Sequence, residues 1–104
     1  MKRKAFIMRL HPGCEEEYKR RHDAIWPELK DALHKAGVSD YSIFLDRATD
    51  TLFALQHLAD DSTDEDLPLQ EIMKQWWHRM KDIMDANPDE SPVSEELIEV
   101  FHMD

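Results

Sequence analysis

Residues 40–58 read DYSIFLDRATDTLFALQHL, and this stretch decides what kind of fold the chain can form. Two short apolar runs, 40–46 and 51–58, flank a polar segment, which is the pattern of a β-hairpin. Neighbouring apolar residues such as Leu52 and Phe53 must point to opposite faces, because side chains alternate along a strand. Both faces of the hairpin therefore need a cover of other apolar surface.

A strand and an amphipathic helix are predicted before the hairpin. Apolar residues alternate over residues 2–10, which indicates a strand buried on much of both faces. Over residues 14–36 they recur at three- and four-residue steps, which predicts a helix that ends before Gly37. Pro27 interrupts this pattern, and because proline cannot donate a backbone hydrogen bond we expect the helix to kink or break close to His22.

The second half of the chain predicts another helix and a last strand. Residues 59–66 form a charged loop, and Pro68 suits the first turn of a helix. An apolar stripe from Leu69 to Met84 has helical spacing, and residues 97–103 alternate as a strand.

The element order β-α-β-β-α-β is that of a ferredoxin-like unit, an α+β fold with both helices on one face of an antiparallel sheet. We expect residues 1–104 to form a single domain, since a chain of this length has room for one core. The strands carry apolar side chains on both faces, so we expect a second copy to cover the open face in a homodimer.

Charge and cysteine content exclude several classes of partner and compartment. The 13 basic and 23 acidic residues give a net charge of -10, which repels nucleic acid and anionic lipid surfaces. No apolar run approaches the length of a membrane span, and the N-terminal sequence lacks a signal-peptide hydrophobic region. Cys14 is the only cysteine, as in proteins of a reducing compartment. We therefore predict a cytoplasmic protein that binds neither nucleic acid nor membrane.

His22 is the first candidate for chemistry. It stands in the apolar stripe of the first predicted helix, one turn after Tyr18 and one turn before Trp26. An imidazole facing the interior can serve as an acid–base group, or as a core histidine hydrogen-bonded to a carbonyl. The spacing alone leaves both interpretations open.

Aromatic residues form the second candidate group. Trp76, Trp77 and Tyr41 offer faces that stack on a sugar ring and polar tips that reach hydroxyl groups. The alternative is ordinary core packing of a small protein.

The remaining chemistry-bearing residues predict neither a metal site nor a cofactor site. The six histidines lack the spacing to cysteine or carboxylate that metal sites use: His11, His22, His34, His57, His78 and His102. Only two glycines are present, so no glycine-rich phosphate loop exists. Cys14 has no partner arrangement that would make it a catalytic nucleophile.

Four segments taken together resemble the L-rhamnose mutarotase family, and the similarity runs nearly from end to end. They are RRHDAIWPEL, YSIFLD, QWWHRM and NPDESPV, beginning at residues 20, 41, 75 and 87. The resemblance implies a cofactor-free isomerase that interconverts the α and β anomers of L-rhamnose or a related deoxyhexose, built as a dimeric α+β barrel.

The resemblance also implies which residues form the site. The family's catalytic histidine falls on His22, and its substrate-binding residues fall on Tyr18, Tyr41, Trp76 and Trp77. A departure from the family pattern is Asp23, where many members have asparagine, and a carboxylate close to His22 would raise the pKa of the imidazole.

Two other functions remain open on this fold, since fold does not determine function. One is a cofactor-independent monooxygenase, which shares the dimeric α+β barrel. The other is a non-catalytic sugar-binding module, which would bind the sugar without exchanging its anomers.

Overall fold

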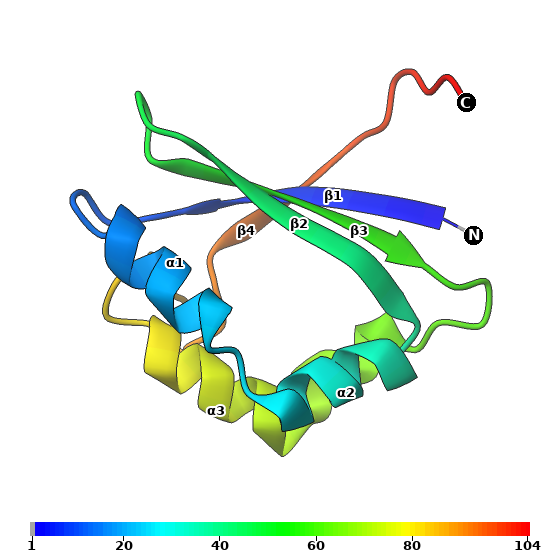
Figure 1. The fold of residues 1–104 in the computed structure, drawn as a ribbon, viewed down its shortest axis with the longest axis horizontal. Helices are drawn as coiled ribbons and strands as arrows, with labels where there is room; N and C mark the ends of the chain where they lie inside the picture. The colour runs from blue at the N-terminus through cyan, green and yellow to red at the C-terminus, as the bar shows by residue number, and fades with distance from the viewer. Residues whose placement is uncertain (1) are drawn as a thin grey trace.

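The structure, a computed structural model, describes residues 2–104 as a sheet with the helices against one of its faces (Figure 1). The elements in chain order are β1 (Lys2–Arg9), α1 (Glu15–Asp23), α2 (Pro27–Lys35), β2 (Val38–Asp46), β3 (Thr51–Leu58), a 3₁₀ helix η1 (Asp64–Leu69), α3 (Glu71–Met80) and β4 (Ser94–Leu97). The predicted α+β class is confirmed.

The sheet has the strand order β2-β3-β1-β4, and each neighbouring pair is antiparallel. The β2–β3 hairpin lies where the sequence predicted it, and β3 spans the predicted residues 51–58. β1 pairs with β3 along its whole length, so it lies in the interior of the sheet. Its other edge pairs with β4 over Ala5 to Met8.

A β-bulge interrupts the pairing of β2 with β3. The register shifts between Ser39 and Ser42, so that Asp40 and Tyr41 together oppose the single residue Gln56. Asp40 has a positive φ of 48°, a conformation that aspartate tolerates better than most residues. The bulge therefore interrupts the regular alternation of side chains at Tyr41, which sequence analysis assigned to the site.

The core lies between the sheet and the helices, and its buried members come from strands, helices and the segment after α3. They are Met8, Leu10, Tyr18, Leu29, Leu52, Ala54, Trp76, Met80, Ile83 and Met84. On the opposite face of the sheet Phe44 is 63% exposed and Phe53 41% exposed. The expected alternation is therefore present, and the helices cover only one face.

The prediction of one continuous helix over residues 14–36 was wrong. Two helices, α1 and α2, occupy this range, with a non-helical break at 24–26. Pro27 is the first residue of α2, and Trp26 before it has an extended ψ of 131°. A residue that precedes proline is driven out of the helical region, so the expected kink is a complete break.

The second half of the chain differs from the prediction at two elements. Pro68 lies inside the 3₁₀ helix, and α3 begins only at Glu71 and ends at Met80, before the predicted Met84. The last strand was predicted over 97–103 but β4 ends at Leu97, and the following residues lie exposed without a strand. Alternation alone does not make a strand, because the backbone also needs a neighbour to pair with.

Candidate functional site

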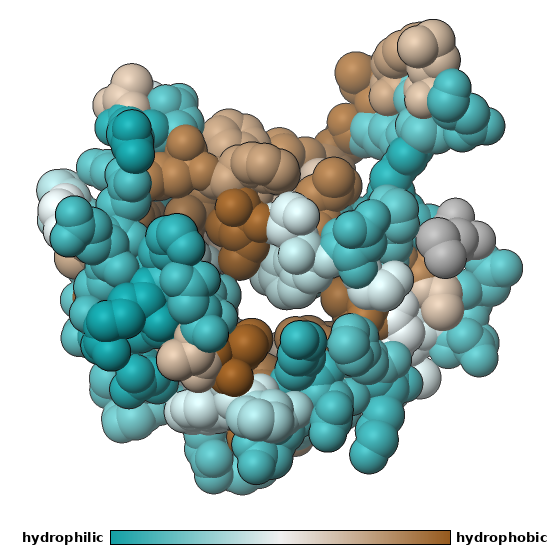
Figure 2. All heavy atoms as spheres, viewed as in Figure 1, coloured by the Kyte–Doolittle hydropathy of each residue, from teal (hydrophilic) through white to brown (hydrophobic). Residues whose placement is uncertain are grey.

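A cavity of about 1010 Å³ lies between the inner face of the sheet and the helices. Figure 2 shows the molecule hollowed between these two layers. All five residues that the sequence assigned to the site line this cavity: Tyr18, His22, Tyr41, Trp76 and Trp77. They come from α1, β2 and α3, so distant parts of the chain meet there.

The imidazole of His22 is held between two aromatic rings. The Tyr18 ring stacks on it with the centroids 4.3 Å apart and the planes at 25°. The Trp76 indole meets it edge to face at 5.3 Å and 90°. These contacts link α1 to α3 and leave the imidazole few orientations.

The hydrogen bond of His22 determines which ring nitrogen carries the proton. Nδ1 lies 3.1 Å from the backbone carbonyl oxygen of Tyr18. A carbonyl oxygen can only accept, so Nδ1 is the donor, and in the neutral ring Nε2 carries the lone pair. Nε2 is therefore the nitrogen able to take up a proton.

Burial lowers the pKa of His22 below its ordinary value of about 6.5. The hydrogen bond to the Tyr18 carbonyl and the charge of Asp23 oppose this shift without reversing it. Asp23 therefore raises the pKa of His22, as expected, but desolvation of the imidazole lowers it by more. Asp23 is exposed and forms an ion pair with Lys19 at 2.9 Å.

The two tyrosines present protonated hydroxyl groups to the cavity. Burial raises the pKa of Tyr18, and the nearby Tyr41 adds to this rise. Tyr41 is 38% exposed as a whole residue, yet burial of its hydroxyl raises its pKa to about 12, against an opposing hydrogen bond with Gln56. At neutral pH both phenols are hydrogen-bond donors and not bases.

The tryptophan pair lies on α3 with the two indoles in different environments. Trp76 is buried in the core cluster and meets Trp26 edge to face at 5.1 Å. Trp77 is only partly buried and packs at the edge of that cluster. The cavity thus has one rigid indole, fixed by its neighbours, and one that retains accessible surface.

The family model described as L-rhamnose mutarotase matches residues 3–103. The chain belongs to the L-rhamnose mutarotase family. An L-rhamnose mutarotase of Bacteroides thetaiotaomicron is 58% identical over 104 residues, covering 100% of both chains. One of Rhizobium johnstonii is 55% identical over 103 residues, covering 99% of this chain and 97% of the relative.

The crystal structure of an L-rhamnose mutarotase from Formosa agariphila matches with a TM-score of 0.93 at 52% identity, and the match covers 100% of both chains. L-rhamnose mutarotases are isomerases that interconvert the anomers of a carbohydrate. The predicted family and enzyme class are therefore confirmed.

One residue that lines the cavity was missed by sequence analysis. Gln56 is a buried polar residue that lines the cavity and bonds to Tyr41. The strand alternation could have found it, because Gln56 follows Leu52 and Ala54 at the alternate positions of β3 that face the core. Trp26, which sequence analysis also did not assign to the site, packs against Trp76 without lining the cavity.

Within residues 2–104, no group of three histidine, cysteine or acidic side chains lies close enough to hold a metal ion. Cys14 is a free thiol whose Sγ lies 3.8 Å from the carbonyl oxygen of Pro12. None of the helices described here is both long and apolar enough to span a bilayer.

Proposed function

We propose that this chain interconverts the α and β anomers of L-rhamnose, with His22 as the acid–base group. The observation that carries the proposal is the His22 imidazole, held by Tyr18 and Trp76 inside a cavity with its Nε2 lone pair unprotonated. A core histidine would need no such cavity. The family to which the chain belongs supports the choice of L-rhamnose as substrate.

One histidine suffices for the proton transfers of ring opening. Neutral His22 accepts the proton of the anomeric hydroxyl at Nε2, and the C1–O5 bond breaks to give an open-chain aldehyde. The imidazolium then returns the same proton to O5. One imidazole can reach both O1 and O5, because both oxygens are bonded to C1 in the closed ring. Rotation about C1–C2 followed by the reverse steps closes the ring as the other anomer. A positioned acid–base group of this kind contributes about 10²–10⁴-fold.

The other four residues bind and orient the sugar in this proposal. Tyr18 and Tyr41 donate hydrogen bonds to sugar oxygens, since their raised pKa values keep them protonated. Trp76 and Trp77 stack on the C–H face of the ring. The Tyr18 backbone has a further role, because its carbonyl fixes the His22 tautomer.

We further propose that the chain is a single ferredoxin-like domain and that two copies form a dimeric α+β barrel. The support is the sheet face opposite the helices, where Phe44, Phe53, Leu55 and Leu97 remain exposed. Figure 2 shows hydrophobic residues gathered along the sheet side of the molecule. A self-complementary two-fold contact would bury this face. A cytoplasmic location is supported by the free thiol of Cys14.

The test is anomer exchange in the His22→Asn variant, with His78→Asn as the matched control. His78 also lies on a helix, but it is exposed, pairs with Glu90 at 2.8 Å and does not line the cavity. Saturation transfer between the anomeric proton signals of L-rhamnose measures the exchange rate. We expect His22→Asn to lose about 10²–10⁴-fold while keeping its fold, and His78→Asn to match the parent.

Three outcomes would overturn parts of this proposal. A folded His22→Asn protein with parental activity would move catalysis to another residue. Sugar binding without anomer exchange in the parent would indicate a binding module. Oxygen consumption with an organic substrate, and no exchange for any deoxyhexose, would favour the monooxygenase alternative.

A further inference from the structure

Helix α1, which carries His22, is short and has little apolar anchoring. It spans nine residues, and Tyr18 is its only buried residue. His22 lies one residue before the helix ends, next to the break that leads into α2. Besides the ring contact of His22 with Trp76, a second interaction joins this end of α1 to α3.

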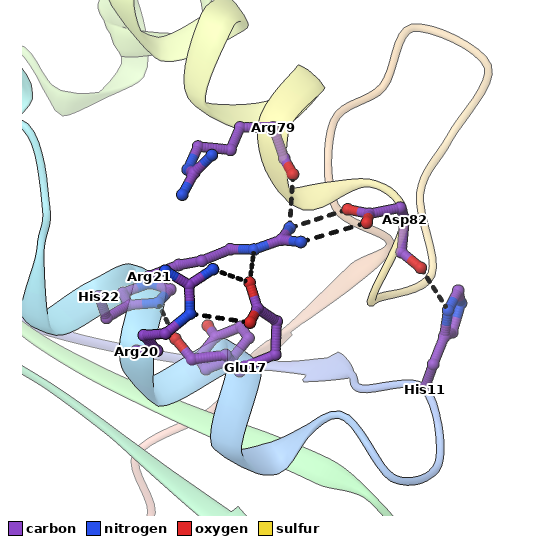
Figure 3. Close-up of polar contacts among 8 residues, drawn as sticks. His11, Glu17, Arg20, Arg21, His22, Arg79 and Asp82 are labelled. Atoms are coloured by element: carbon purple, nitrogen blue, oxygen red, sulfur yellow. Dashed lines mark hydrogen bonds and ion pairs between the residues drawn. The ribbon is translucent and has the colours of Figure 1, made fainter.

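Arg21 supplies that interaction, as Figure 3 shows. Its Nη1 donates to the backbone carbonyl oxygen of Arg79 at 2.6 Å and to Oδ1 of Asp82 at 2.8 Å, and its Nη2 donates to Oδ2 of Asp82 at 3.2 Å. Its Nε donates to Oε2 of Glu17 within α1 at 2.6 Å. The Arg21 side chain is only 11% exposed, whereas Asp82 is 62% exposed, so this two-pronged contact is covered on the arginine side and open to water at the carboxylate.

The other charged contacts of α1 do not anchor this end of the helix. Arg20 bonds to Glu17 on the same helix and is 64% exposed. The Glu15–Arg47 ion pair reaches the β2–β3 hairpin, but it lies at the first turn of α1 with Arg47 80% exposed. Exposed pairs of this kind contribute little to the position of an element.

Adjacent residues of a helix differ in direction by about 100°, so Arg21 and His22 face different neighbours. Arg21 reaches the end of α3, while His22 meets Trp76, one turn before the Arg79 carbonyl. A contact that fixes the backbone at residue 21 therefore also fixes the place of the next ring relative to α3.

We propose that Arg21 is a positioning residue, which through Asp82 and the Arg79 carbonyl holds His22 in its reactive place against Trp76. The inference rests on the proposed acid–base role of His22. Arg21 itself touches no reacting atom. The planar guanidinium suits this role because its rigid fork makes two parallel bonds to the carboxylate while one nitrogen also reaches the carbonyl, whereas lysine offers a single flexible ammonium without that fork.

The test compares Arg21→Lys with Arg20→Lys, two charge-conserving changes at neighbouring positions. We expect Arg21→Lys to lower kcat by about 10- to 100-fold with little change in KM, because a small displacement of a catalytic group is costly while the indoles still bind the sugar. Its His22 pKa, followed by NMR of the imidazole protons, should rise toward the ordinary value as the ring becomes less buried. Arg20→Lys should match the parent in both readouts.

Asp82→Asn provides an independent check, because the amide oxygen still accepts one hydrogen bond but lacks the charge. It should change kcat and the His22 titration in the same direction by a smaller amount. Parental kcat and titration in folded Arg21→Lys would overturn the proposal. A kcat that falls only with the folded fraction, at unchanged titration, would also overturn it in favour of a purely structural role. Full activity of His22→Asn would instead refute the proposed function, while the titration would still report on the geometry.

Discussion

At the scale of single residues, the environment of His22 determines the pH range of the reaction. The neutral imidazole is the reactive form, because only it has a lone pair at Nε2. Burial lowers its pKa below about 6.5, so the neutral form predominates from about pH 7 upward. The tyrosines titrate far above this range.

We therefore expect the exchange rate to fall only when the pH drops through the lowered pKa of His22. It should stay flat from about pH 7 to about pH 9, since no cavity phenol ionises there. Asp23→Asn is the informative variant, because Asp23 raises the pKa of His22 and its removal should move the acid limb to lower pH. Exchange rates from saturation transfer, measured as a function of pH for the parent and for Asp23→Asn, give the flat range and the shift of the acid limb. An acid limb that moves upward in Asp23→Asn would contradict this assignment.

Trp77 is the residue at which sugar stacking can be tested apart from stability. Trp76 is part of the core, so its removal would leave a large cavity, whereas Trp77 is only partly buried. We expect Trp77→Ala to raise KM by about threefold to tenfold, as the loss of about 1 kcal/mol of stacking predicts, with a smaller effect on kcat. Steady-state measurements on L-rhamnose check this. An unchanged KM would remove Trp77 from the binding site.

At the scale of elements, the corner between α2 and β2 depends on a close approach to the loop after β3. Gly37 has a φ of +91°, and a Cβ added there would lie 2.9 Å from Cβ of Ser62. Two backbone hydrogen bonds hold the corner against this loop. The carbonyl oxygen of Gly37 accepts from the N–H of Ala59 at 2.9 Å, and the carbonyl oxygen of Ala36 accepts from the N–H of Thr63 at 2.8 Å. The position therefore requires glycine for both its conformation and its space.

Gly13 provides the matched comparison, because its φ is +79° but a Cβ there would meet nothing within 4 Å. We expect Gly13→Ala to cost about 1–2 kcal/mol through backbone strain alone. Gly37→Ala should cost more, because the Ser62 backbone must also move. Chemical denaturation of both variants measures the difference in the free energy of unfolding. Equal losses would indicate that the loop gives way freely.

At the scale of the whole molecule, the face of the sheet opposite the helices exposes large apolar side chains to water. Phe53 lies on the interior strand β3, opposite Phe44 of β2 and Ile7 of β1, so it occupies the middle of this face. Contiguous apolar surface of this kind on a soluble protein is characteristic of a contact site for a partner.

We expect the parent to be a dimer at micromolar concentration and Phe53→Lys to shift it toward monomer, because a buried unpaired charge is costly at a two-fold contact. Leu69→Lys is the control, since Leu69 is 75% exposed on η1, away from the sheet. Sedimentation velocity distinguishes the two species. A monomeric parent at this concentration would contradict the proposed barrel.

The sequence by itself determined the class of the fold, the β2–β3 hairpin and five of the residues that line the cavity. Strand alternation and helical stripes are local properties, and the family motifs are short, so neither needs the folded chain to be read. The sequence also contained the cause of the helix break, because proline acts on the residue before it.

Only the tertiary structure decided the rest. β4 ends at Leu97 although β1 extends three residues beyond the Ala5 with which Leu97 pairs, and the tautomer of His22 depends on the Tyr18 carbonyl that meets it. The Arg21 contact joins residues that lie 61 positions apart, at Asp82. No local pattern contains such pairs, because they form only when packing brings distant backbone and side-chain groups within hydrogen-bond distance.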